Sequence, residues 1–148
     1  MLSRRNVRIK VMQILYSMNR DKKLDFNHAL LQFREGVRVS YELYLFNLLQ
    51  FIRIAEYSKQ DAAKKMAKLL PTEEDKQFTA KLAENDLLKS LAQNEGLHRL
   101  FRSHKLTERL DKDLTRLIYT EFAKTEAYKD YIKQEKSQYK DHEKVLLA

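Results

Sequence analysis

The stretch that decides the fold is Val39–Ala55, which reads VSYELYLFNLLQFIRIA. Apolar residues recur in it at steps of three and four, the spacing that places side chains on one face of an α-helix. The apolar run is interrupted by polar residues that include Glu42, Asn47, Gln50 and Arg53. The stretch is therefore too polar to span a membrane, and it predicts the core helix of a helical protein.

The same periodic pattern extends in both directions, so that residues 24–70 are predicted to form a long core helix or a pair of helices. Gly36 and Ser58 are the two places where this helix can kink or divide, because a glycine costs about 1 kcal/mol in a helix interior. We expect two pieces. Pro71 ends the pattern.

The N-terminal segment predicts a first helix from Ser3 to about Asn19. The Ser3 hydroxyl can accept a hydrogen bond from a backbone N–H group at the helix start. On a helical wheel this segment has two apolar stripes, and a helix that is apolar on two sides is expected to pack between neighbours. One stripe contains Val7, Val11, Ile14, Leu15 and Met18, and the other contains Ile9, Met12 and Tyr16.

Residues 72–148 predict further helices. Thr72 followed by three acidic residues favours a helix start, and this helix is expected to run to about Gln93. Asn94-Glu95-Gly96 predicts a turn. Together with the segments before Pro71, the pattern predicts an all-α protein, an orthogonal bundle of five to seven helices in a single domain over residues 1–148. The remaining helices are expected at residues 97–104, 107–124 and from 126 onward.

Composition excludes several classes of protein. The 148 residues include two Gly, one Pro and no Cys, and so little Gly and Pro excludes an all-β fold. Gly36 and Gly96 are too far apart to form a phosphate-binding loop of the Rossmann or P-loop kind. The lack of cysteine fits a cytoplasmic protein without disulfides, and the N-terminus has no secretory apolar segment.

Positive charge is concentrated at the N-terminus. The chain has 29 Lys and Arg residues against 21 Asp and Glu residues, a net charge of +8. Seven of the basic residues and one of the acidic residues lie in residues 1–23, so this segment alone carries +6. A basic surface that is this localised favours a polyanionic partner.

Arg4, Arg5 and Arg8 lie in the first two turns of the predicted first helix, at the positive end of its dipole. An exposed cation there costs about 0.3–1 kcal/mol, so helix stability alone does not favour arginine. The same helix end offers free N–H groups to a phosphate, and arginine binds phosphate in a bidentate manner. We therefore predict that these three arginines bind RNA, with Lys10 extending the basic surface. Gln13 and Tyr16 are expected to serve packing and hydrogen bonding.

Residues 4–16 read RRNVRIKVMQILY. This string resembles the N-terminus of the NusB family of bacterial transcription antitermination factors, which open with two arginines, a third three residues later, and then Gln and Leu-Tyr. Val7 and Val11 stand where the family usually has alanine. The matching positions are Arg4, Arg5, Arg8, Gln13, Leu15 and Tyr16.

The resemblance implies an all-helical fold and an arginine-rich motif that binds the boxA segment of nascent RNA. It also implies a ribosomal-protein partner, NusE, and a role in helping RNA polymerase read through terminators. The segment that resembles the family covers only 13 of the 148 residues. Past Asn19 the usual family body does not align, so we interpret the chain as a long-form member. A helical insertion then follows the first helix, and the chain ends before the family's C-terminal part.

The sequence is also compatible with other functions. A helical protein–protein interaction module could use Val39–Ala55 and the C-terminal apolar residues for docking. We expect no catalytic activity and no cofactor, because no nucleophile–base arrangement stands out among the 21 acids. The pairs Asp25–His28 and Glu95–His98 have the spacing of helical di-iron ligands, but they are too incomplete to predict a metal site.

The C-terminal segment combines tyrosines with lysines, which superficially suits base stacking. Acidic residues offset those lysines, so a packed aromatic stripe beside a solvated charged face is the preferred interpretation. The tyrosines are Tyr128, Tyr131 and Tyr139.

Overall fold

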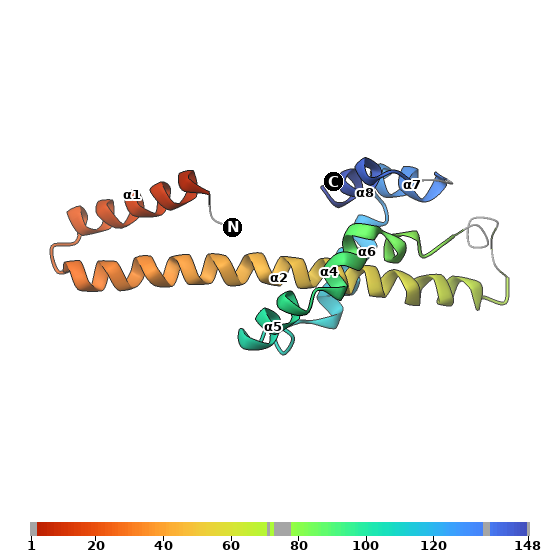
Figure 1. Ribbon diagram of the computed structural model, residues 1–148, viewed down its shortest axis with the longest axis horizontal. Helices are drawn as coiled ribbons and strands as arrows, with labels where there is room; N and C mark the ends of the chain where they lie inside the picture. Colours follow the sequence, from red (N-terminus) through yellow and green to blue (C-terminus); the bar gives the residue numbers. More distant parts are fainter. Residues whose placement is uncertain (1–2, 71, 73–77, 135–136, 148) are drawn as a thin grey trace. The chain divides into compact units, whose positions relative to one another are not determined.

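The structure is a computed structural model that describes residues 3–70, 72, 78–134 and 137–147 (Figure 1). Within these ranges it contains seven α-helices, one 3-10 helix and no strand, which confirms the predicted all-α class. The chain divides into two compact units, Met1–Asn47 and Leu48–Ala148. Among the described helices, none combines the length and the apolar character that a membrane span requires.

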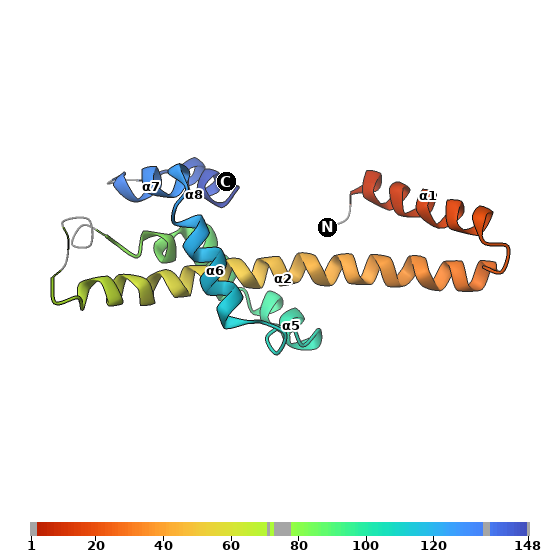
Figure 2. The ribbon, with the colours of Figure 1, turned by 180° about the vertical axis from the view of Figure 1, so that it is seen from behind.

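Helix α1 (Arg4–Arg20) begins as predicted. The Ser3 Oγ atom accepts a hydrogen bond from the backbone N–H of Asn6 at 3.2 Å. The helix ends at Arg20, and the carboxylate of the next residue, Asp21, accepts from the backbone N–H of Lys23 at 3.0 Å. This turn lets α1 fold back along the start of α2 inside the first unit, as both ribbon views show (Figures 1 and 2).

Helix α2 (Phe26–Met66) runs unbroken over 41 residues, so the predicted division into two pieces is wrong. Its start agrees with the prediction, since the Asp25 carboxylate accepts from the backbone N–H of His28 at 2.9 Å. The first part of α2 belongs to the first unit and its remainder, from Leu48, to the second.

Local hydrogen bonds and ion pairs stabilise α2 at Gly36 and at Ser58, the two points where it was predicted to divide. Around Gly36, the Arg38 guanidinium bonds Glu35 on one side, with Nε 2.8 Å from Oε2, and Glu42 on the other. Such pairs at steps of three and four offset part of the cost of about 1 kcal/mol for a helical glycine. Ser58 is buried, and its hydroxyl donates to the carbonyl of Ala55 at 2.7 Å. Neither residue therefore forces the helix to end.

The helix predicted from Thr72 to about Gln93 is confirmed in its last part, since residues 86–93 are helical, but its predicted start is wrong where the structure describes it. Residues 73–77 lie outside the described residues, and residues 78–80 are not helical. The 3-10 helix η1 (Lys81–Glu84) comes next, followed by α4 (Asp86–Gln93). Asn85 is fully buried and caps α4, because its Oδ1 accepts from two backbone N–H groups of the first turn at 3.0 and 3.4 Å.

The sequence predicts a turn at Asn94-Glu95-Gly96, but in the structure these residues begin a helix. Asn94 is the N-cap of α5, its Oδ1 accepting from the backbone N–H of Leu97 at 3.0 Å, and Gly96 lies in the first helical turn. Asp111 caps the next helix by accepting from the backbone N–H of Asp113 at 2.8 Å. The C-terminal helices are α5 (Glu95–Ser103), α6 (Lys112–Phe122), α7 (Glu126–Lys133) and α8 (Tyr139–Leu146).

The core of the second unit forms where α6 crosses α2 (Figure 2). Tyr119 of α6 lies edge-on against Tyr57 of α2, with ring centroids 5.1 Å apart. Its hydroxyl donates to the Asp61 carboxylate at 3.0 Å. The buried residues of this core are Ile54, Ala55, Leu82, Leu88, Tyr119, Tyr128, Tyr131 and Val145.

Polar side chains join α4, α7 and α8 inside the second unit. The Asn85 side chain donates to the carbonyl of His142 at 3.2 Å, and the Tyr131 hydroxyl lies 2.8 Å from His142 Nδ1. The Lys81 ammonium donates to the carbonyl oxygens of Tyr131, at 2.6 Å, and Gln134. The preferred interpretation of the C-terminal tyrosines is confirmed for Tyr128 and Tyr131, which are buried, whereas Tyr139 is exposed.

Burial of these tyrosines predicts a loss of stability at alkaline pH. Burial raises the pKa of the Tyr131 hydroxyl to about 12, whereas an unfolded chain releases this proton near pH 10. Between these values only the folded chain holds the proton. The contribution of the Tyr131 hydroxyl to the free energy of unfolding is therefore complete below about pH 10. It falls by about 1.4 kcal/mol per pH unit from there to about pH 12. Urea unfolding from about pH 9 to 12 should show a shallower decline for Tyr131→Phe than for the wild type. The exposed Tyr139→Phe is the control, and parallel pH curves for wild type and Tyr131→Phe would contradict this account.

Candidate nucleic-acid interface

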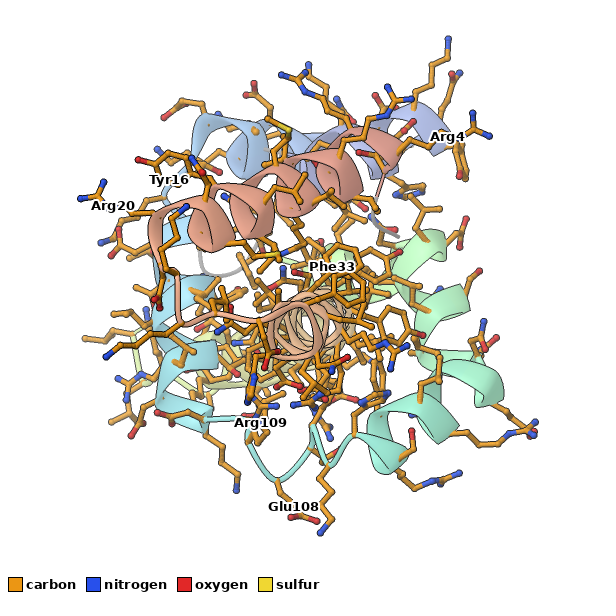
Figure 3. All side chains as sticks on the ribbon, turned by 90° about the vertical axis from the view of Figure 1, so that its left-hand side faces the viewer. Arg4, Tyr16, Arg20, Phe33, Glu108 and Arg109 are labelled. Atoms are coloured by element: carbon orange, nitrogen blue, oxygen red, sulfur yellow. The ribbon has the colours of Figure 1, made fainter. Side chains whose placement is uncertain are left out.

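Arg4, Arg5 and Arg8 form one surface at the start of α1. At about 100° per residue, the three side chains occupy a sector of roughly 100° around the helix axis. All three are exposed. Figure 3 shows Arg4 pointing away from α2. The structure therefore brings the three predicted arginines together on an open face of the helix.

The charge of this arginine sector is not neutralised by its own helix. Residues 4–20 contain no Asp or Glu, so no pairing at steps of three or four is available. In the described part of the chain, no ion pair is formed by any of the three arginines. By contrast, Arg38 is held by two glutamates, and Arg53 Nη1 lies 2.7 Å from Glu56 Oε2.

Lys10 lies apart from the arginine sector. It projects about 120° away from the nearest arginine around the helix axis. The Lys10 side chain is half-buried, and its ammonium lies 3.7 Å from where a Cβ atom on Gly36 would stand. Lys10 therefore faces α2. Its role in RNA binding remains a prediction.

The exposed face of α1 is more apolar than the sequence suggested. No residue of α1 is buried, so the expected packing of this helix between neighbours is wrong. Val7, Ile14 and Met18 are half-buried, on the side of the helix that faces α2. Phe33 lies between α1 and α2 in Figure 3.

Tyr16 is 62% exposed and Met12 67% exposed, and with Leu15 they continue the arginine sector along the helix. The packing role expected of Tyr16 and Gln13 is therefore wrong, although the Tyr16 hydroxyl accepts a hydrogen bond from Arg20 Nη1 at 3.2 Å. A helical wheel centred on the arginines, and not on the apolar residues, would have identified this combined surface.

This face combines the two chemistries that single-stranded RNA offers. Guanidinium groups bind phosphate oxygens in a bidentate manner and stack on unpaired bases through their planes. An exposed tyrosine ring supplies a further stacking surface. The N–H groups at the start of α1 can also meet an anion. Phosphate binding would thus remove the electrostatic penalty of placing arginines at this helix end.

The other candidate sites consist of fewer side chains. Among the described residues, no group of three or more His, Asp or Glu side chains could hold a metal ion. Asp25 and His28 contact each other at 2.9 Å, and hydrogen bonds from His28 lower the pKa of the Asp25 carboxyl. His98 Nε2 lies 2.7 Å from the carbonyl of Ala92.

Comparisons of the chain with models of protein families, with curated proteins and with solved structures found no match. The functional argument therefore depends on the arrangement of side chains on α1.

Removing the cap of α1 is expected to loosen the helix end that presents the arginines. Ser3→Ala removes the acceptor of the Asn6 N–H group, and loss of such a cap costs about 0.5–2 kcal/mol. Backbone amide exchange at Val7 and Arg8 should become about fivefold faster, while exchange in α6 stays unchanged. Ser3→Thr, which keeps a capping hydroxyl, should exchange like the wild type. Equal exchange in all three proteins would show that the cap does not hold this end.

Proposed function

We propose that this chain is an RNA-binding regulator of transcription antitermination of the NusB type. The observation that carries the proposal is the exposed arginine sector of α1, which has no acidic partner in the described part of the chain. The segment that resembles the family, residues 4–16, lies within this helix. In this proposal the protein acts by binding and not by catalysis.

The proposed ligand is single-stranded RNA with a boxA-like sequence. Arg4, Arg5 and Arg8 bind its phosphates, and Tyr16 provides a ring on which an unpaired base can stack. A ribosomal-protein partner equivalent to NusE and the RNA polymerase antitermination complex complete the proposed assembly. We place this activity in the bacterial cytoplasm, where nascent RNA is made.

Salt dependence follows from the number of phosphate contacts. Each contact on a single strand contributes a slope of roughly −0.7 when log affinity is plotted against log salt concentration. The three arginines contribute about −2 to this slope, and a fourth contact from Lys10 makes the contribution of α1 about −3. The change in slope when Lys10 is replaced by Gln therefore reports whether Lys10, which faces α2, takes part.

Replacing Arg4, Arg5 and Arg8 together by Ala tests the proposal. The triple variant should retain much less of a boxA-like oligonucleotide than the wild type does, because the phosphate contacts of α1 are removed. Its helical circular-dichroism signal should stay the same, since the three side chains are exposed. Filter binding and circular dichroism measure the two quantities.

The matched control is the triple Ala variant of Lys22, Lys23 and Arg34, three exposed residues of the same unit. It removes the same charge and should retain most of the RNA binding. Equal retention by the wild type and the Arg4/Arg5/Arg8 variant would remove the proposed function. Equal loss in both variants would reduce it to non-specific charge attraction.

A second candidate function is a helical protein–protein interaction module. It is favoured by large apolar side chains that are exposed on both helices of the first unit. In Val39–Ala55, the predicted docking stretch, Leu45, Leu49 and Ile52 are buried. Docking through apolar surface would be nearly insensitive to salt, unlike RNA binding. The exposed side chains include Ile9, Met12, Leu15, Phe26, Leu31, Val39 and Leu43.

A further inference from the structure

A cationic groove lies between α2 and α6 in the second unit, with a volume of about 500 Å³. Its α2 wall carries Arg53, Glu56 and Lys64, and its α6 wall carries Lys112, Asp113 and Arg116. Four cations thus face two acids across one concave surface. None of these residues belongs to the N-terminal segment that carries most of the net charge of the chain.

Most of the positive charge in the groove is uncompensated. Arg53 is neutralised by Glu56 through the 2.7 Å pair within α2. This leaves Lys64, Lys112 and Arg116 against the single carboxylate of Asp113. In the ranges that the structure describes, none of these three cations forms an ion pair.

Elsewhere in the same unit, some exposed lysines are paired with an acid three residues away. Lys124 lies 2.6 Å from Glu121, and Lys129 lies 2.8 Å from Glu126. Pairing at these spacings is the ordinary way in which a helix surface balances its charge. Lys64, Lys112 and Arg116 have no such pair in the described part of the chain, and they line one concave surface, so they are available together to a ligand.

Buried contacts between α2 and α6 hold the two walls of the groove together. The Thr115 hydroxyl lies 3.4 Å from Gln50 Oε1, and both side chains are buried. One turn further along α6, Tyr119 packs on Tyr57 and donates a hydrogen bond to Asp61. Because these contacts fix α6 on α2, the cations are already gathered before a ligand arrives, which lowers the entropic cost of binding.

The chemistry of the groove favours phosphates over bases. The Lys64 ammonium lies over the Tyr57 ring, 5.5 Å from its centroid, so that ring is already covered on one side. The Asp111 carboxylate already accepts a hydrogen bond from the backbone N–H of Asp113. The N-terminal end of α6 is therefore not the part of the groove that binds the phosphate. The remaining groups are long, solvated cations that suit the repeated charges of an extended backbone.

We propose that this groove binds the phosphodiester backbone of single-stranded RNA without regard to base sequence. The proposal rests on the RNA-binding function proposed above and adds a second contact to it. The arginine sector then selects the RNA, and the groove binds phosphates of single-stranded RNA through charge alone.

The test uses the full chain with Lys64→Gln, Lys112→Gln and Arg116→Gln combined. The probe is a fluorescent oligouridylate, which has the phosphate backbone of RNA but no boxA sequence. Three lost contacts at roughly 0.7 each should reduce the salt slope by about 2, which corresponds to about 100-fold weaker binding at 0.1 M salt. Fluorescence anisotropy over a salt series measures both quantities.

The matched control combines Lys133→Gln, Lys140→Gln and Lys144→Gln, three exposed lysines of α7 and α8 that do not line the groove. It removes the same charge and should weaken binding far less. Circular dichroism should be unchanged in both variants, since the replaced side chains lie on the surface. Equal weakening in both variants, or no weakening in the groove variant, would overturn the proposal.

Two further probes separate other sources of negative charge. Uridine monophosphate should not displace the oligouridylate at micromolar concentration, because one phosphate cannot span the groove. Displacement at that concentration would make the groove a nucleotide pocket and overturn the proposal. Binding of polyglutamate that is lost in the groove variant, with oligouridylate binding intact, would overturn it in favour of an acidic protein partner.

The two RNA proposals fail separately. If the Arg4/Arg5/Arg8 variant keeps its preference for a boxA-like oligonucleotide over oligouridylate, the function proposed for α1 fails while the groove stands. If the groove variant binds oligouridylate like the wild type, the groove proposal fails while the arginine sector stands.

Discussion

The functional account depends on one electrostatic constraint: α1 contains no acidic residue. Charged side chains on a helix can pair with partners three and four positions away, and such pairs balance charge within α2 and α7. Arg38 bonds Glu35 and Glu42 within α2, and Lys129 bonds Glu126 within α7. Arg4, Arg5 and Arg8 have no such neighbour. Their charge is therefore left for a ligand, at a helix end whose dipole also favours an anion.

The first helix and the fold class could be predicted because they depend on local signals. The Ser3 cap, the end of α1 near Asn19 and the start of α2 at Asp25 follow from side chains that bond backbone groups within three residues. The absence of strands from the described residues follows from the apolar periodicity and from the scarcity of glycine and proline. Such features need no knowledge of distant parts of the chain.

The errors concern helix ends at residues that can serve two roles. Gly36 was expected to divide α2, but its cost of about 1 kcal/mol is small beside the continuous apolar pattern and the ion pairs that flank it. Asn94 was expected to mark a turn, but an asparagine before a helix caps it equally well. Asn85 has the same capping role, so α4 begins there and not at Thr72.

The candidate surfaces were only partly predictable. The arginines could be found because they cluster in sequence, whereas the exposure of Tyr16 could not, since an apolar stripe alone does not show which side is covered. The groove between α2 and α6 joins Lys64 to Arg116, residues far apart in the chain. Only the crossing of the two helices, fixed by Tyr57, Tyr119 and Asp61, brings them together.

The central claim, that unneutralised arginines on α1 meet RNA, is tested most directly by NMR of the arginine side chains. Nε–Hε signals would be followed while a boxA-like oligonucleotide is added to the full chain. The account predicts that the signals of Arg4, Arg5 and Arg8 shift and saturate together, while that of Arg38, held by two glutamates, stays in place. Unchanged signals from the three α1 arginines at saturating oligonucleotide would contradict the account.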